Sequence, residues 1–220
     1  MELNKFKYPL GDEGNVGNFY REIFFENEYN RHGVGVEPGD VVFDLGAYVG
    51  MFSHYALTKG AKHVYTIEAD RIRYNCLVEN TKDYPQITTY IAHVSDRTTK
   101  GDTSDDNNPE HYNVEKLMTE NNLTTVDFVK MDIESWEYPS LMNMSDKTMS
   151  SIRKWAIEIH FDYVSANKQI RWEHGVDFDG HKVSKLLHIM DKFTRNGFKL
   201  AYEQIHNDYG IAMLYAVKSI

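Results

Sequence analysis

The chain has 220 residues, of which 41% are hydrophobic, and its formal net charge at neutral pH is -9. This length suits a single domain with a sizeable apolar core. An acidic chain of this size is unsuited to general nucleic-acid binding, which needs a basic face to neutralise phosphates. The single cysteine, Cys76, excludes an internal disulfide and a cysteine-rich zinc site.

The sequence also bears on the compartment. The N-terminal residues lack the apolar run of a signal peptide, and no stretch approaches the about 18 consecutive apolar residues of a membrane-spanning helix. A single cysteine fits a reducing environment. We therefore expect a cytoplasmic protein that does not contact a membrane.

The apolar pattern predicts strands and helices that alternate along the chain. Residues 17–31 predict one helix within a polar segment, residues 1–38, which we expect to form a helical lid before a domain of residues 39–220. Within that domain, apolar runs predict strands at 41–46, 63–69, 86–91, 126–132 and 152–160, and amphipathic runs predict helices at 51–60, 71–82, 114–121 and 183–196. Residues 98–110 are rich in Gly, Asp, Asn, Ser and Thr and predict an exposed loop.

The last two predicted strands, residues 198–204 and 210–218, are joined by too few residues for a crossover helix, so they predict an antiparallel hairpin. The fold expected from these elements is α/β, with a doubly wound, mostly parallel seven-stranded sheet and a terminal antiparallel hairpin. Ligands of such sheets bind outside the carboxyl ends of the strands. The residues that follow each strand are therefore the candidates for function.

A glycine-rich turn follows the first strand, in the sequence DLGAYVG. Gly46 and Gly50 bracket it, and glycines there let the backbone approach a ligand closely. Asp44 would repel a dinucleotide pyrophosphate, and Glu68 ends the second strand, where an acid commonly binds ribose hydroxyls. These carboxylates favour S-adenosylmethionine, which carries an ammonium and a sulfonium, over NAD. The alternative is that Asp44 caps the following helix and Glu68 is a solvated strand end.

Titratable side chains follow two neighbouring strands at matched spacing. Asp132 and Glu134 lie two residues apart, as do Glu158 and His160, so all four are expected to converge. Two mechanisms for activating an alcohol fit them. Either His160 or Asp132 acts as general base, or Asp132, Glu158 and His160 hold a divalent cation such as Mg²⁺.

The same residues have a structural interpretation. Glu134 and Glu137 could form ion pairs with Lys130 or Arg153, and His160 could be an ordinary hydrogen-bonded histidine at a strand end. A non-catalytic or NAD-binding protein of doubly wound fold is the alternative to an enzyme that transfers methyl groups.

These motifs resemble those of a known family. DLGAYVGMFS is similar to the first motif of class I methyltransferases, and VDFVKMDIESWEYPSL resembles the signature of the FkbM family, usually close to K-I-D-V-E-G-x-E. WAIEIH resembles that family's fifth strand, and the resemblance covers about residues 41–160. It implies an O-methyltransferase that acts on a hydroxyl of a sugar, glycan or hydroxylated small molecule.

The resemblance also implies roles for individual residues. It implies that S-adenosylmethionine contacts Asp44, Gly46, Ala47, Tyr48, Gly50, Phe52, Glu68, Ala69, Ser95, Asp96 and Asp132, with Ser95 and Asp96 near the adenine. The convergence expected from their spacing makes Asp132, Glu134 and His160 the candidate catalytic residues. Three departures lie beside the expected acceptor pocket: Tyr48 replaces the usual Asn, Ser135 and Trp136 replace Gly-Ala, and Pro139 shortens the next helix. A sugar could stack on Tyr163 or Trp172, unless that segment is an ordinary surface connection.

Overall fold

A computed structural model describes residues 2–96, 110–160, 181–206 and 211–219. Its strands are β1 (Val41–Leu45), β2 (His63–Glu68), β3 (Ile87–Val94), β4 (Glu110–Tyr112), β5 (Val126–Met131), β6 (Ile152–His160), β7 (Phe198–His206) and β8 (Ile211–Lys218). Its helices are η1 (Leu3–Lys5), α1 (Glu13–Phe24), α2 (Met51–Thr58), α3 (Arg71–Thr81), α4 (Val114–Glu120), α5 (Glu137–Asn143), α6 (Asp146–Ser150) and α7 (His181–Arg195).

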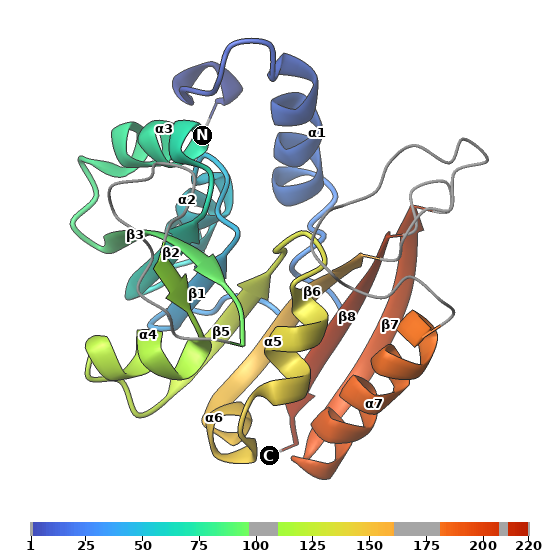
Figure 1. Cartoon of the computed structure of the whole chain (residues 1–220). Coiled ribbons are helices and arrows are strands. Elements are labelled where there is room, and N and C mark those ends of the chain that lie inside the picture. Colours follow the sequence, from blue (N-terminus) through green and yellow to red (C-terminus); the bar gives the residue numbers. More distant parts are fainter. Residues whose placement is uncertain (1, 97–109, 161–180, 207–210, 220) are drawn as a thin grey trace.

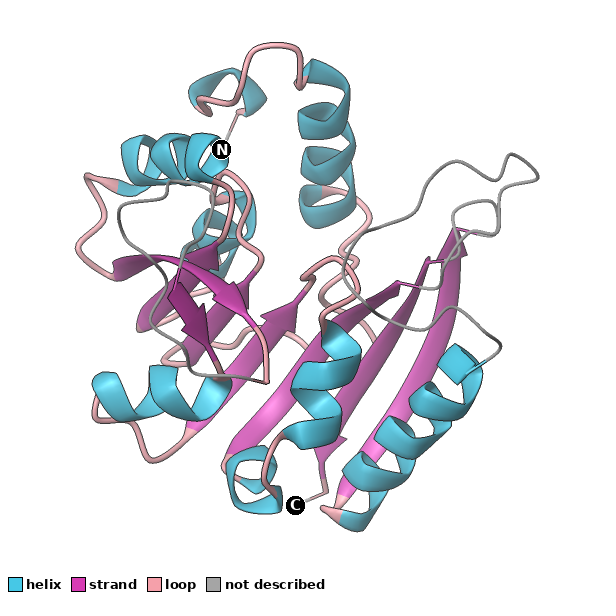
Figure 2. Ribbon diagram, in the orientation of Figure 1, coloured by secondary structure: helices cyan, strands magenta, loops and turns pink. Residues whose placement is uncertain are grey.

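The strands form one sheet in the order β4-β3-β2-β1-β5-β6-β8-β7 (Figure 1). Neighbours from β4 through β6 are parallel, whereas β8 is antiparallel to both β6 and β7. The doubly wound α/β fold with a terminal antiparallel hairpin is therefore confirmed. The helices cover both faces of the sheet (Figure 2).

Two predicted elements need correction. The sheet has eight strands rather than seven, because β4 adds three residues to the edge at β3. A strand this short shows no alternation in the sequence, and its first residue, Glu110, had been assigned to the exposed loop. The rest of that loop, residues 98–109, lies outside the described residues.

The second correction concerns the N-terminal helix, which was expected at residues 17–31. Helix α1 instead spans Glu13–Phe24 and buries Val16 and Ile23. It cannot continue to residue 31 because Asn27, three residues after its end, has a φ angle of 51°, which a right-handed helix cannot accommodate. The remainder of the predicted helix is an irregular segment that descends toward the sheet. Among the described helices, none combines the length and apolar character needed to cross a bilayer.

A hydrophobic core lies on each face of the sheet. On one face Trp155 and Ile157 of β6 pack with residues of α4 to α7. On the other, Phe128 of β5 and Ala156 of β6 pack with residues of α1 and α2. Because side chains alternate along a strand, Lys130 and Glu158, two positions after Phe128 and Ala156, lie on the same face as α1 and α2. This alternation brings the polar groups of the candidate site to one face.

Candidate active site

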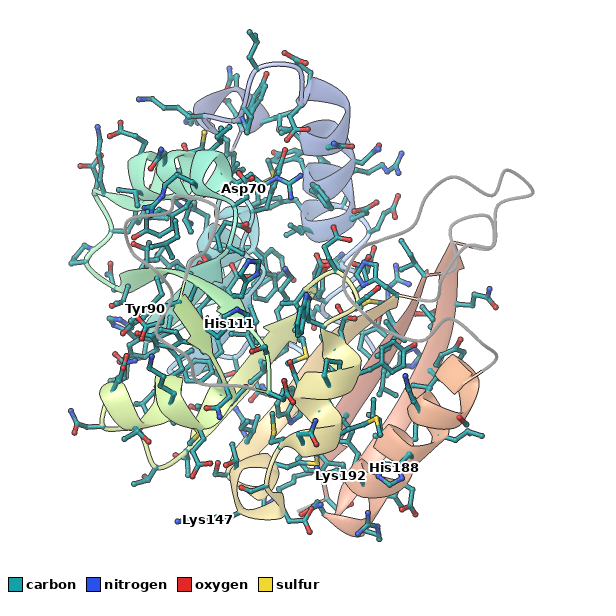
Figure 3. The ribbon with its side chains drawn as sticks, viewed as in Figure 1. Asp70, Tyr90, His111, Lys147, His188 and Lys192 are labelled. Atoms are coloured by element: carbon teal, nitrogen blue, oxygen red, sulfur yellow. The ribbon has the colours of Figure 1, made fainter. Side chains whose placement is uncertain are left out.

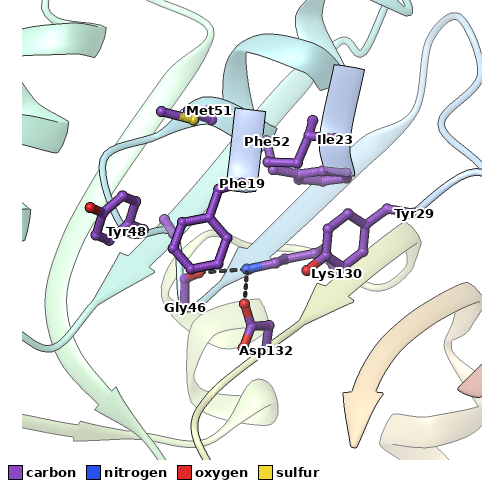
Figure 4. Close-up of a pocket in the computed structure, with 10 residues that line it drawn as sticks. Phe19, Ile23, Tyr29, Gly46, Tyr48, Met51, Phe52, Lys130 and Asp132 are labelled. Carbon is purple, nitrogen blue, oxygen red and sulfur yellow. Dashed lines mark hydrogen bonds and ion pairs between the residues drawn. The ribbon is translucent and has the colours of Figure 1, made fainter. Parts of the chain in front are cut away.

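A pocket lies at the carboxyl ends of β1 and β5, below helix α1 (Figure 4). Its empty space measures about 320 Å³, part of it open to solvent. The walls are largely apolar and aromatic, and two charged residues, Lys130 and Asp132, complete the lining. The lining residues are Phe19, Ile23, Tyr29, Gly46, Ala47, Tyr48, Met51, Phe52, Lys130 and Asp132. The pocket lining therefore includes four of the predicted cofactor residues between positions 46 and 52, together with Asp132, whereas Gly50 is not part of it.

The glycine turn is shaped by positive φ angles. Gly46 has φ of 78°, and a Cβ there would lie 1.7 Å from the Asp132 carbonyl oxygen, so only glycine allows β1 and β5 to end this close together. Gly50 has φ of 89° and precedes α2. Tyr48 has a φ angle of 54°, in the left-handed region, which Asn adopts more readily than Tyr. The resemblance described above has Asn at this position. Its hydroxyl donates a 2.6 Å hydrogen bond to Asp12, just before α1.

Asp44 lies fully buried below this turn. It accepts a 2.6 Å hydrogen bond from the Ser53 hydroxyl, while its other oxygen, Oδ1, has no hydrogen-bond partner and lies 3.6 Å from Lys130 Nζ. Helix α2 begins at Met51, and its N-cap Gly50 supplies no side-chain cap; Asp44 accepts its hydrogen bond from the Ser53 hydroxyl and not from a backbone N-H, so the alternative that Asp44 caps the helix is wrong. Burial raises the pKa of the Asp44 carboxyl, against the opposing effect of Lys130.

Glu68 is 7% exposed, so the alternative of a solvated strand end is also wrong. Its two oxygens accept 2.8 Å hydrogen bonds from the backbone N-H groups of Tyr48 and Asp70. Asp70 begins the turn into α3 (Figure 3). Glu68 thus joins the glycine turn to the start of α3, and each oxygen keeps a second lone pair for a ligand hydroxyl.

The residues expected near the adenine lie outside the pocket lining. Ser95 is buried at the end of β3 and shares a 3.1 Å hydrogen bond with His111 Nδ1 of β4 (Figure 3). Asp96 accepts a 3.1 Å hydrogen bond from Asn143. Ala69 directly follows β2. Tyr163 and Trp172 lie outside the described residues.

The predicted convergence at the ends of β5 and β6 is present. One ligand atom each of Asp132, Glu158 and His160 lie within 4.8 Å of one another. His160 Nε2 is 3.8 Å from Asp132, 3.6 Å from Glu158 and 3.7 Å from Glu134. The strand register explains this, because Lys130 and Ala156 are paired, which puts the residues two positions further along side by side.

The other nitrogen of His160 contacts a different carboxylate. Nδ1 lies 3.1 Å from Glu137 Oε1, which also accepts a 2.9 Å hydrogen bond from the Ile133 backbone N-H. The structural interpretation, in which Glu134 and Glu137 pair with Lys130 or Arg153, is therefore wrong in the described residues. Arg153 instead pairs with Glu37 and Asp40 near the opposite end of the sheet.

Burial and crowding of carboxylates perturb this cluster. Burial, and then the neighbouring Asp132, raise the pKa of Glu158 well above its usual range. Burial by itself would lower the pKa of His160, but Glu137, Glu158 and Asp132 outweigh burial and raise it to about 10. In this arrangement the imidazole of His160 carries a proton at neutral pH. That argues against His160 as the general base.

Sequence reasoning missed two residues of the site. Tyr29, from the segment after α1, donates a 3.1 Å hydrogen bond to Glu158 Oε2 and packs edge-on against Phe52. No periodicity or motif marks Tyr29 in the sequence. Lys130 had been considered only as an ion-pair partner, although its place in the K-x-D-x-E pattern, two residues before Asp132, could have indicated it.

The fold is that of S-adenosylmethionine-dependent methyltransferases. Aeropyrum pernix fibrillarin with natively bound S-adenosyl-L-methionine matches with a TM-score of 0.55 and 14% identity, covering 91% of this chain and 76% of that chain. Magnesium protoporphyrin IX methyltransferase from Synechocystis PCC 6803 with bound S-adenosylhomocysteine matches with a TM-score of 0.53 and 17% identity, covering 96% and 84%. At these identities the likeness concerns the fold.

The family is shown by the sequence. A model described as the methyltransferase FkbM domain matches residues 44–200, so the chain belongs to the FkbM methyltransferase family. It is also 56% identical over 43 residues to the 31-O-demethyl-FK506 methyltransferase FkbM of Streptomyces tacrolimicus. That stretch is 20% of this chain and 16% of the relative.

Proposed function

We propose that the protein transfers a methyl group from S-adenosylmethionine to a hydroxyl oxygen positioned at Asp132, Glu158 and His160. The observation that carries this proposal is that Asp132 both lines the pocket and belongs to the cluster with Glu158 and His160 at the ends of β5 and β6. A methyl donor in the pocket and an acceptor at the cluster would meet there. Methyl transfer needs such in-line positioning above all.

The pocket residues suit this cofactor. Phe19, Met51 and Phe52 offer apolar walls, and the carboxylate of Asp132 favours positive groups such as the sulfonium and ammonium. A dinucleotide pyrophosphate would meet this carboxylate as a like charge, which disfavours the NAD-binding alternative. When bound, S-adenosylmethionine supplies the methyl group. In the transfer, the carbon-sulfur bond would break with its electron pair left on sulfur, the carbon-oxygen bond would form, and Asp132 as candidate base would take the hydroxyl proton.

The cluster also fits a divalent cation, which would favour the ionised form of the acceptor hydroxyl. Asp132 and Glu158 supply carboxylate oxygens, and the contact of His160 Nδ1 with Glu137 orients Nε2 toward them. A carboxylate on the outer nitrogen is the usual support of a metal-bound histidine. Because one atom each of Asp132, Glu158 and His160 lie within 4.8 Å of one another, we favour cation binding by these three residues over base catalysis by His160. Without a cation, Asp132 is the candidate base.

The acceptor class follows from charge and family. A net charge of -9 disfavours RNA, so a sugar, a glycan or a hydroxylated small molecule is the acceptor we favour. The FkbM relative is named for methylation of an oxygen on FK506, which supports oxygen as the methylated atom. A non-catalytic protein of the same fold would bind the cofactor without turnover.

The first test is binding followed by turnover. Calorimetry should detect one site for S-adenosylhomocysteine and no site for NAD. Labelled methyl donor is then incubated with glycans, free sugars and phenolic compounds, with EDTA and with Mg²⁺ or Mn²⁺ restored. Asp132→Asn should reduce transfer by more than about tenfold, a barrier change of about 1.4 kcal/mol.

Asp127→Asn is the matched control, because Asp127 is on the same strand but contacts Arg153 and the Val41 backbone away from the pocket. Cofactor binding with no transfer to any acceptor would favour the non-catalytic alternative. Transfer that ignores EDTA would remove the cation from the proposal and leave the methyltransferase in place.

A further inference from the structure

Lys130 places a buried positive charge in the cofactor pocket. Its side chain is 5% exposed, and among the described residues it is the one basic member of the pocket lining. Figure 4 shows its ammonium beside Gly46 and Asp132. Nζ donates a 2.5 Å hydrogen bond to the Gly46 carbonyl oxygen and lies 3.4 Å from Asp132 and 3.6 Å from Asp44.

The ammonium of Lys130 remains charged in this setting. The carboxylates of Asp132 and Asp44 lie 3.4 Å and 3.6 Å from Nζ and favour its charged form. The face of the Tyr29 ring lies 5.6 Å from Nζ and adds a weaker attraction. The pocket therefore holds a fixed cation next to the carboxylates.

A second buried lysine, Lys154, serves as a comparison, because protein groups alone satisfy its ammonium. Lys154 is 2% exposed, and its Nζ contacts the Gly35 carbonyl at 2.5 Å, Asp40 at 3.0 Å and Glu37 at 3.1 Å. Three short contacts satisfy the three donors of that ammonium. Lys130 Nζ has one short contact, to the Gly46 carbonyl oxygen. Its hydrogen bond to the Leu45 carbonyl oxygen is 3.5 Å long, and its two carboxylates lie at 3.4 Å and 3.6 Å. A ligand oxygen on the pocket side can therefore replace one of these longer contacts as a hydrogen-bond acceptor.

The charges of the cofactor indicate which of its groups could contact the Lys130 ammonium. S-adenosylmethionine would bring a sulfonium and an ammonium toward Lys130, and like charges repel strongly where water is excluded. The same amino-acid end carries a carboxylate, which is the complementary partner of a buried ammonium. The ligand's ammonium would then interact with Asp132.

We propose that Lys130 Nζ binds the carboxylate of the amino-acid end of the cofactor and so selects ligands that carry this end. The inference rests on the proposed function, because it assigns a subsite of the same pocket. Lys130 is a binding residue in this account, and its removal should affect ligands according to whether they have a carboxylate.

Two ligands separate the subsite from the rest of the pocket. S-adenosylhomocysteine has the amino-acid end, whereas 5′-methylthioadenosine keeps the adenosine and the thioether but lacks it. Calorimetry on the full chain is done with both ligands for the unmodified protein, Lys130→Met and the control Lys154→Met. We expect Lys130→Met to weaken S-adenosylhomocysteine by about tenfold or more and 5′-methylthioadenosine by less than about twofold. Lys154→Met should leave the ratio of the two affinities unchanged.

Equal weakening of both ligands by Lys130→Met, or no weakening of either, would overturn the subsite. Failure of the unmodified protein to bind either ligand would instead defeat the proposed function. If Lys130→Met does not fold, the affinity of the unmodified protein for decarboxylated S-adenosylhomocysteine is measured instead. This compound should bind at least about tenfold more weakly than S-adenosylhomocysteine, because it lacks the carboxylate. Equal affinity for these two ligands would contradict a role of Lys130 toward the carboxylate.

Discussion

The hydroxyl of Tyr29 donates a 3.1 Å hydrogen bond to Glu158 Oε2 and thereby attaches the segment after α1 to the acidic cluster of β6. We expect Tyr29→Phe to weaken Mn²⁺ binding by about tenfold, because a partner that orients a metal ligand commonly contributes that much. Calorimetry with Mn²⁺ measures the effect. Tyr55→Phe is the control, since the Tyr55 hydroxyl contacts Asn27 and Asn30 rather than the cluster. Equal Mn²⁺ affinities of the Tyr29 and Tyr55 variants would contradict this role.

Glu137 should act on the same cation through His160. Its Oε1 contacts His160 Nδ1 at 3.1 Å, and its carboxyl is fully buried. Glu137→Gln keeps the shape but removes the charge that orients the imidazole, so we expect Mn²⁺ affinity to fall by about 10- to 100-fold. Binding of S-adenosylhomocysteine should stay within about twofold, because Glu137 is not among the residues that line the pocket. A parallel loss of both ligands would indicate that Glu137 supports the fold instead.

The sequence was sufficient for the fold and for the cluster for one physical reason. Strand and helix periodicities are local, and the two-residue spacing of Asp132 with Glu134 and of Glu158 with His160 already indicated one face at the ends of two adjacent strands. Strand β4 was not predicted from the sequence because three residues are too few to show a period. The end of α1 was predicted too late because it depends on the positive φ angle of Asn27, in a polar segment without a clear signal.

The contacts of the site were harder to predict because they are tertiary. Tyr29 and Glu158 are 129 residues apart, and nothing local relates them. Lys130 appeared in the motif, but only the register that pairs it with Asp44 places its ammonium below the glycine turn. The structural alternative pairs Glu137 with Lys130 or Arg153, whereas its partner in the structure is His160.

Helix α1 is held over the pocket by the hydrogen bond from the Tyr48 hydroxyl to Asp12 and by the ring contact of Phe19 with Tyr48 at 5.0 Å. We propose that residues 1–38 act as a lid through this contact. Tyr48→Phe keeps the ring and removes a hydrogen bond to a charged group, a loss of about 1.5 kcal/mol or about tenfold. We expect faster amide hydrogen exchange in α1 and faster release of S-adenosylhomocysteine. Tyr74→Phe on α3 is the control, and unchanged exchange in α1 would contradict the lid.

Glu28 should make the stability of the protein depend on pH. Its side chain is 3% exposed in the segment between α1 and the sheet. Burial, followed by the nearby charge of Glu22, raises the pKa of Glu28 to about 8, against the opposing effect of Arg31. In the unfolded chain the pKa of a glutamate is about 4.3. Between these two values the folded state binds more protons than the unfolded state, so the free energy of unfolding must fall as pH rises.

Urea denaturation at pH 5.5 and pH 8.5 tests this expectation. We expect the unmodified protein to lose roughly 2 to 4 kcal/mol more stability across that interval than Glu28→Gln, because each pKa unit corresponds to about 1.4 kcal/mol. Glutamine imitates the protonated carboxyl and cannot ionise, so the variant should exceed the unmodified protein in stability modestly at pH 5.5 and by more at pH 8.5. Glu26→Gln is the control, since Glu26 lies on the surface and pairs with Arg21. Equal pH dependence of the unmodified protein and Glu28→Gln would show that Glu28 is ionised in the folded state at neutral pH.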